Sequence, residues 1–154
     1  LPIAVLTVDC APVLIYDNNS KMIAAIHAGW KGAFKDIVKK VIKFMIKKGC
    51  SVENMTAVIG PSISQKNYEV KEDFKKKFIQ KDKNNLKYFK ISKKKLYFDL
   101  TKYIYSSLKT NEVKYIDVLK IDTYDAKNKF FSARRAIKLK HGDYGRNISI
   151  IMLN

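Results

Sequence analysis

The stretch TVDCAPVLIYDNNSKMIAAIHAGWKG, Thr7–Gly32, decides the fold of this chain. Two apolar runs, Val13–Tyr16 and Met22–Ile26, flank the polar segment Asp17–Ser20, whose Asp, Asn and Ser residues favour a turn. Apolar runs of strand length on either side of a turn predict a β-hairpin made of two buried strands.

Upstream of this hairpin, Ile3–Val8 is another apolar run of strand length, and we expect Pro12 to separate it from the hairpin. Downstream, Ala28–Gly32 is expected to be a loop. A helix should follow it, because apolar residues repeat at helical spacing from Phe34 to Ile46. Gly49 is the expected helix cap.

The rest of the chain alternates strands and helices irregularly. Strands are predicted at Met55–Ile59, Tyr115–Ile121 and Ile148–Leu153, helices at Lys71–Gln80 and from an Asp99 N-cap through Leu108, and a loop at Lys81–Asn85. Residues 127–144 show no clean period. The sequence therefore predicts an α+β fold, in which mixed β-sheets flanked by helices form one layered domain over residues 1–154.

The composition limits the classes of partner. Thirty-one Lys+Arg against fourteen Asp+Glu give a net charge of +17, yet arginine occurs only at Arg134, Arg135 and Arg146. Base readout in nucleic acids favours arginine, so a solvated lysine-rich surface is preferred over a nucleic-acid-binding module. Attraction of small anionic substrates is a further alternative. We find no membrane-spanning run and no signal peptide, and two cysteines make no disulfide framework. We therefore expect a cytoplasmic protein without a membrane partner.

Cys10 and His27 are the residues with metal chemistry. They lie seventeen residues apart and meet only if the hairpin brings its open ends together. A thiolate and a neutral imidazole are good zinc ligands. The alternative is a buried structural cysteine and a hydrogen-bonded histidine at a strand end. Asp9 is expected to point to the opposite face of an extended strand.

Four ordered blocks extend this interpretation over nearly the whole chain. They are TVDCAPVL at 7–14, AAIHAGWKG at 24–32, IGPSI with YEV at 59–70, and FFSARR with YGR at 130–146. They resemble the blocks of the laccase-domain family, whose members were first called polyphenol oxidases. These proteins were later assigned purine nucleoside phosphorylase and adenosine deaminase activities.

The resemblance implies that Cys10 and His27 are catalytic and are two of three zinc ligands. It implies phosphorolysis of adenosine, inosine, guanosine or methylthioadenosine to a free base and ribose 1-phosphate, and deamination of adenosine to inosine. Zinc would activate water for the deamination.

Four further residues are candidates for binding substrate. Arg134 and Arg135 could hold phosphate in their guanidinium forks, or could instead pair with an interior carboxylate or a strand carbonyl. Trp30 could stack on a purine or pack the loop onto the helix. Gly60 is expected in a shaped loop near the site.

The main departure from the family is a missing ligand. The family's third zinc ligand is a histidine in a Gln-x-His block upstream of the position that matches Leu1. We therefore expect an N-terminally truncated form, in which a partner chain, His141 or water completes the metal site. Alternatives are a degenerate domain without catalysis, or a copper phenol oxidase. The copper site would need a second histidine and a weak axial ligand, which are not evident here. The oligomeric state is not specified by the sequence.

Overall fold

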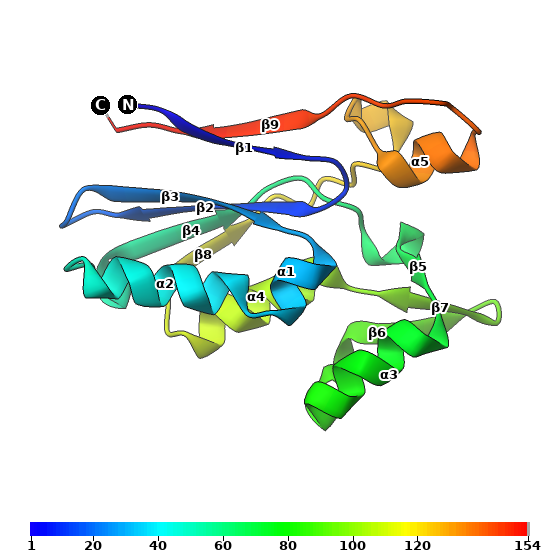
Figure 1. The fold of residues 1–154 in the computed structure, drawn as a ribbon, viewed down its shortest axis with the longest axis horizontal. Helices are drawn as coiled ribbons and strands as arrows, with labels where there is room; N and C mark the ends of the chain where they lie inside the picture. The colour runs from blue at the N-terminus through cyan, green and yellow to red at the C-terminus, as the bar shows by residue number, and fades with distance from the viewer. Residues whose placement is uncertain (154) are drawn as a thin grey trace.

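A four-stranded mixed sheet forms the centre of the computed structural model, which describes residues 1–153 (Figure 1). Its strand order is β3-β2-β4-β8, from β2 (Ala11–Asp17), β3 (Met22–Ala28), β4 (Met55–Ile59) and β8 (Tyr115–Val118). The first three strands pair antiparallel, and β8 joins β4 in parallel. The expected α+β class with mixed sheets is confirmed.

The β2–β3 hairpin is confirmed, and its turn has a clear local cause. The Asp17 carboxylate accepts hydrogen bonds from the backbone N–H groups of Asn19 and Ser20 at 2.9 and 2.7 Å. Pro12 does not lie outside the strand as expected: it is part of β2 and pairs with His27. The hairpin is therefore longer than the apolar runs alone indicated.

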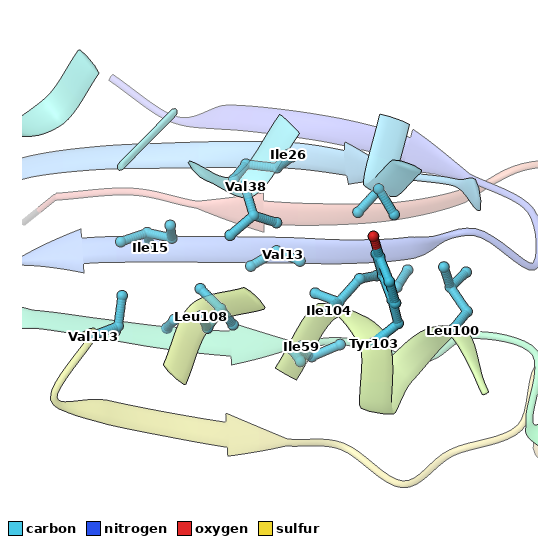
Figure 2. Close-up of a cluster of buried hydrophobic side chains, with 14 of the residues drawn as sticks. Val13, Ile15, Ile26, Val38, Ile59, Leu100, Tyr103, Ile104, Leu108 and Val113 are labelled. Atoms are coloured by element: carbon cyan, nitrogen blue, oxygen red, sulfur yellow. The ribbon is translucent and has the colours of Figure 1, made fainter. Parts of the chain in front are cut away.

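Helices cover one face of this sheet. Figure 2 shows Val13, Ile15 and Ile59 of the sheet directed toward α4 (Leu100–Thr110), whose N-cap Asp99 accepts the N–H of Lys102 as predicted. Beside α4 lie α1 (Trp30–Phe34) and α2 (Ile37–Lys47). The core is the layer between sheet and helices. It includes side chains with no more than 2% exposure, among them Val13, Ile15, Val38, Ile42, Met45, Ile59, Leu100, Ile104 and Leu108.

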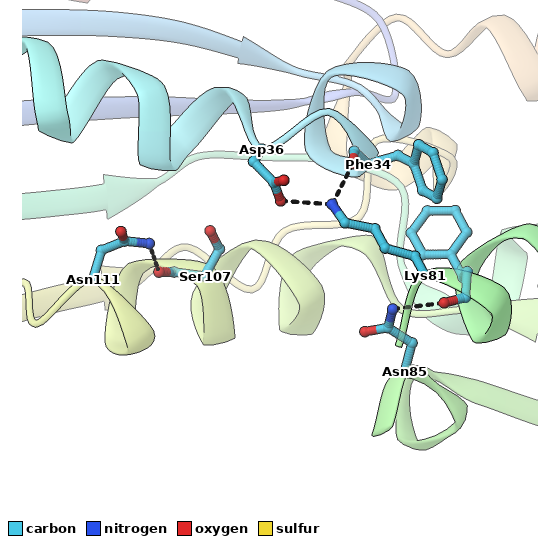
Figure 3. Close-up of polar contacts among 7 residues, drawn as sticks. Phe34, Asp36, Lys81, Asn85, Ser107 and Asn111 are labelled. Atoms are coloured by element: carbon cyan, nitrogen blue, oxygen red, sulfur yellow. Dashed lines mark hydrogen bonds and ion pairs between the residues drawn. The ribbon is translucent and has the colours of Figure 1, made fainter. Parts of the chain in front are cut away.

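The predicted single helix from Phe34 to Ile46 is interrupted. Asp36 adopts a left-handed backbone conformation (φ 59°, ψ 39°), which ends α1 and lets α2 begin in a new direction. Lys81, the last residue of α3 (Glu72–Lys81), stabilises the backbone between α1 and α2. Its Nζ contacts the Phe34 carbonyl and the Asp36 carboxylate (Figure 3). The loop expected at Ala28–Gly32 is correspondingly shorter, since Trp30 already begins α1.

A two-stranded ribbon lies over the other face of the central sheet. It pairs β1 (Ile3–Thr7) antiparallel with β9 (Asn147–Ile151), so the two chain ends lie side by side (Figure 1). Both strands contact β3. The ribbon and the helices thus sandwich the four-stranded sheet.

A third, smaller sheet extends to one side, with order β5-β7-β6 from β5 (Glu69–Val70), β6 (Phe89–Ser92) and β7 (Lys95–Phe98). Its aromatic side chains pack with α3, as in the contacts of Phe74 with Phe89 and Phe98. Neither the β6–β7 hairpin nor α5 (Ala133–Lys138) was predicted from the sequence. Short 3₁₀ turns, η1 to η4, complete the chain at Val52–Asn54, Gln65–Asn67, Lys83–Tyr88 and Ala126–Asn128, where η3 replaces part of the expected loop. No helix among residues 1–153 is both long and apolar enough to cross a membrane.

Candidate active site

Cys10 and His27 come together at the open end of the β2–β3 hairpin. His27 pairs with Pro12 in the hairpin register, and Cys10 directly precedes β2. The position that a Cβ on Gly29 would occupy lies 2.7 Å from Cys10 Sγ and 3.8 Å from His27 Nε2. The thiol and the imidazole thus both border the space over Gly29. Zinc binds sulfur at about 2.3 Å and nitrogen at about 2.0 Å, so an ion shared by the two would need them within about 4.4 Å of each other.

Two glycines shape this end of the hairpin. A side chain at Gly29 would collide with the Cys10 sulfur, so the absence of a Cβ keeps the space between thiol and imidazole open. A Cβ at Gly60 would lie 2.8 Å from Pro12 Cγ, and the Gly60 N–H donates to the Pro12 carbonyl. Gly60 therefore packs behind the strand residue that faces His27.

A cavity of about 240 Å³ adjoins Cys10. Among its lining residues, Cys10, Trp30 and Arg134 were predicted as site residues, whereas His27, Gly60 and Arg135 do not line it. Trp30 lines the cavity and its ring lies 5.1 Å from the ring of Phe74, so it packs against α3, whereas its stacking on a purine stays a prediction. One predicted metal ligand and two predicted substrate-binding residues thus share one enclosure.

The two adjacent arginines have different environments. Arg134 donates from Nη1 to the Glu69 carbonyl at 2.7 Å, and its guanidinium lies 5.3 Å from the centre of the Tyr68 ring. Within residues 1–153, its Nε and Nη2 have no hydrogen-bond acceptor. Arg134 can therefore offer donors to an anionic ligand.

The guanidinium of Arg135, in contrast, is already hydrogen-bonded to the loop before α5. Its Nη1 donates to the carbonyls of Thr123 and Tyr124, and its Nη2 donates to that of Phe130. Binding to these three carbonyls fixes the segment before α5, so Arg135 has a structural role as the alternative expected, although the carbonyls belong to a loop and not to a strand. The geometry therefore disfavours the phosphate-binding role predicted for Arg135.

Asp9 does not lie in an extended strand as expected, because its backbone is left-handed (φ 68°). Its carboxylate accepts from Thr123 Oγ1 at 2.7 Å and from the Arg134 backbone N–H at 2.8 Å. A carboxylate with two such donors links the Cys10 loop to the start of α5. Asp9 thereby positions Arg134 beside the cavity.

The residues present fit part of a zinc site. Thiolate and imidazole are zinc ligands, and Gly29 leaves room for an ion between them. Among residues 1–153, no third His, Cys, Asp or Glu completes a group with them, and His141 is exposed in the loop after α5. Burial raises the pKa of the Cys10 thiol, and the charge of Asp9 raises it further, whereas a bound cation would favour the thiolate.

Tyr68 is a cavity residue whose role the sequence analysis did not identify. Its side chain is buried, lines the cavity and carries the guanidinium of Arg134 on its face. Burial, with a smaller contribution from Cys10, holds the pKa of its phenol well above the ordinary value, so the hydroxyl stays neutral. The sequence signal that could have identified Tyr68 as a site residue is its place in the YEV block, at 68–70.

Comparison with known proteins gives concordant results. Residues 1–154 match the family described as multi-copper polyphenol oxidoreductase laccase. A purine nucleoside phosphorylase of Rickettsia conorii is 39% identical over 150 residues, covering 96% of this chain and 61% of that protein. An adenosine deaminase from an unknown prokaryotic organism is 38% identical over 71 residues, covering 46% of this chain and 27% of its own.

Solved structures share the fold. The hypothetical protein YfiH of Bacillus licheniformis matches with a TM-score of 0.88 and 28% identity, covering 100% of this chain and 58% of its own. The protein NMB0706 of Neisseria meningitidis matches with a TM-score of 0.83 and 30% identity, over 97% of this chain and 59% of its own. The chain thus spans about three-fifths of the length of the Rickettsia relative and of both solved proteins.

Proposed function

The chain belongs to the multi-copper polyphenol oxidoreductase laccase family, and on this basis we propose that it processes purine nucleosides beside Cys10 and His27. The reactions are phosphorolysis of adenosine, inosine, guanosine or methylthioadenosine to base and ribose 1-phosphate, and hydrolytic deamination of adenosine to inosine and ammonia. One relative named for phosphorolysis and another named for deamination support this proposal. The observation that carries it is the meeting of the thiol and the imidazole across Gly29.

Zinc is the cofactor that this pair would hold, with Cys10 Sγ and His27 Nε2 as two ligands and the third from outside residues 1–153. When bound, zinc supplies Lewis acidity and makes water a stronger nucleophile near neutral pH. The relatives named for purine nucleoside activities favour this chemistry over a copper phenol oxidase, whose blue-copper site needs two histidines, a cysteine and a weak axial ligand.

The chain's own side chains would bind and orient the substrate. Trp30 and Tyr68 offer aromatic surfaces in the cavity, and such surfaces stack on purine rings. Arg134 would hold the attacking phosphate through the donors that it does not use within the fold. Fixing phosphate beside the ribose replaces a bimolecular encounter with an oriented one.

The test is to measure metal content and turnover in the same preparations. The purified chain is incubated with zinc, freed of excess metal, assayed for bound zinc and then given adenosine with phosphate. Expected products are inosine, hypoxanthine or adenine, and ribose 1-phosphate. Cys10→Ala should abolish both bound zinc and turnover. The matched control Cys50→Ala should keep both, because Cys50 contacts Met22 at the far end of β3 from His27.

Gly29→Ala is a sharper variant. Its backbone (φ −77°, ψ 171°) is ordinary for alanine, so the added methyl group acts only by filling the space beside Cys10 Sγ. We expect a folded protein that has lost zinc. Turnover that survives undiminished in Cys10→Ala would refute the assigned centre.

A second candidate is a domain that keeps the family fold without catalysis. The observation in its favour is that no third ligand joins Cys10 and His27 among residues 1–153. A purified chain that holds zinc stoichiometrically and turns over adenosine would reject it. A chain that folds but does neither would favour it.

A further inference from the structure

A second hollow of about 400 Å³ lies outside the cavity at Cys10. Its walls come from separate parts of the chain: Lys66 from η2, Lys95 and Tyr97 from β7, Tyr124 from the loop before η4, and Arg134 and Lys138 from α5. We call this hollow the cationic groove. Contributions from four segments mean that the tertiary fold, rather than a local run of lysines, assembles it.

The charges in the groove are strongly unbalanced. Four cationic side chains, Lys66, Lys95, Arg134 and Lys138, line it together with one carboxylate, Glu69. That carboxylate is already paired, since Lys95 Nζ lies 2.8 Å from Glu69 Oε2. Neither Lys66 nor Lys138 has a salt-bridge partner within residues 1–153, and Lys138 Nζ lies over the Tyr124 ring. The groove is therefore suited to an anion.

The groove adjoins the candidate active site. Arg134 and Ile137 line both hollows, so the two share a wall. The groove alone, at about 400 Å³, falls within the range of about 300–1,000 Å³ that small-molecule sites occupy. An anion bound in it would lie on the other side of Arg134 from the cavity at Cys10.

Phosphate is the anion that this arrangement favours. Arg134 retains Nε and Nη2 as donors, and a guanidinium edge matches two phosphate oxygens. Lys66 and Lys138 add point charges on flexible stems, which can follow a phosphate group into place.

We propose that the cationic groove binds a phosphate group, either inorganic phosphate or the phosphate ester of a nucleotide, next to the cavity at Cys10. This inference rests on the proposed function, because it assigns the second substrate or the substrate's anionic end to a place beside the same centre. It adds Lys66 and Lys138 as binding residues.

Calorimetric titration at fixed ionic strength tests the proposal, with inorganic phosphate, adenosine and adenosine 5′-monophosphate as separate ligands. The double variant Lys66→Gln/Lys138→Gln should weaken binding of the phosphate-bearing ligands on the order of tenfold. The matched control Lys43→Gln/Lys47→Gln removes the same charge from the exposed surface of α2 and should change binding less than about twofold.

The ligands identify the source of the phosphate. Tighter binding of adenosine 5′-monophosphate than of adenosine, lost in the double variant, assigns the groove to an esterified phosphate. Simultaneous binding of adenosine and inorganic phosphate, without tighter binding of the nucleotide, assigns it to inorganic phosphate.

If phosphate binding weakens equally in the double variant and its control, or weakens in neither, the assignment of the groove as a phosphate site is overturned. Zinc content of the same preparations separates this result from failure at Cys10. If only the assignment of the groove is wrong, zinc content still depends on Cys10. If only the assignment of the metal centre is wrong, phosphate binding still depends on Lys66 and Lys138.

Discussion

The central sheet and the outer ribbon use similar apolar strands in different environments. In β2, Val13 and Ile15 are 0% exposed, because the helices cover the face of the sheet from which both side chains project (Figure 2). In the ribbon, Leu6 and Ile148 pair across the strands yet remain 54% and 60% exposed. An apolar run of strand length thus predicts a β-strand in both places. Its side chains stabilise the fold, however, only where another layer packs on them and removes their apolar surface from water.

The site lies where these two regions meet. Cys10 belongs to the link from β1 of the ribbon to β2 of the sheet, and His27 lies near the end of β3, which contacts both ribbon strands. The pair proposed to bind metal therefore depends on the well-packed sheet for its register. The following substitutions compare the two regions, from the largest expected effect to the smallest.

Ile15→Ala should give the largest loss of stability. The side chain is completely buried, so its removal forfeits apolar burial and leaves a cavity, which lowers the free energy of unfolding by about 2–5 kcal/mol. Urea denaturation followed by circular dichroism measures this change. A loss below about 1 kcal/mol would mean that the sheet is not the stable centre of the fold.

Asp17→Asn should cost about 1–3 kcal/mol near neutral pH. Burial alone would raise the pKa of Asp17, but the N–H groups of Ser20, Ser51 and Asn19 lower it below the ordinary value. A lowered native pKa stabilises the fold above the unfolded pKa of about 3.9, and this contribution is lost as the pH falls through the native pKa.

Unfolding curves of the unsubstituted chain and of Asp17→Asn between pH 7 and pH 2 check this dependence. The difference in their free energies of unfolding should be constant near neutral pH and should shrink below about pH 4, where the carboxylate of Asp17 takes up a proton. A difference that stays constant down to the lowest pH would contradict the role of the charged carboxylate.

Asn147→Ala tests the polar anchoring of the ribbon. Asn147 accepts the Phe131 N–H and donates to the Phe131 carbonyl, both at 2.9 Å, in an exposed position. Loss of these bonds should cost about 0.5–1.5 kcal/mol, since water can replace them. Hydrogen exchange should increase in β1 and β9 and stay unchanged in β2, whereas equal increases in all three strands would show that ribbon and sheet open together.

Ile150→Ala should have the smallest effect. The side chain is 55% exposed and pairs with Ala4, so its removal leaves no buried cavity. We expect a change within about 0.5 kcal/mol in the same urea experiment as Ile15→Ala. A loss as large as that of Ile15→Ala would show that another surface covers the ribbon in solution.

Local signals predicted the elements whose causes are local. The β2–β3 hairpin follows from a turn that Asp17 fixes through its neighbours, and α4 begins where the Asp99 carboxylate caps it. The bounds of β4 agree with the predicted strand because an apolar run ends at Gly60-Pro61. The β6–β7 hairpin was missed because its lysines hide the alternation, and its buried residues pack against aromatic rings of α3.

In the candidate site, too, some features could be predicted from the sequence and others depend on the tertiary structure. Sequence blocks identified Cys10, His27, Trp30 and the two arginines, but not which arginine has donors to spare. That difference depends on the Thr123, Tyr124 and Phe130 carbonyls, which bind Arg135 alone. The cationic groove had no signal in the sequence, since its cationic side chains come from three separate segments, η2, β7 and α5.

By itself, the sequence determined the family blocks, the α+β class, the central hairpin and the two residues with metal chemistry, because each depends on neighbours along the chain. Only the tertiary structure decided that β1 pairs with β9, that the helix breaks at Asp36, and that thiol and imidazole meet across Gly29. Those outcomes depend on contacts between distant segments, whose register and packing are set when the layers assemble.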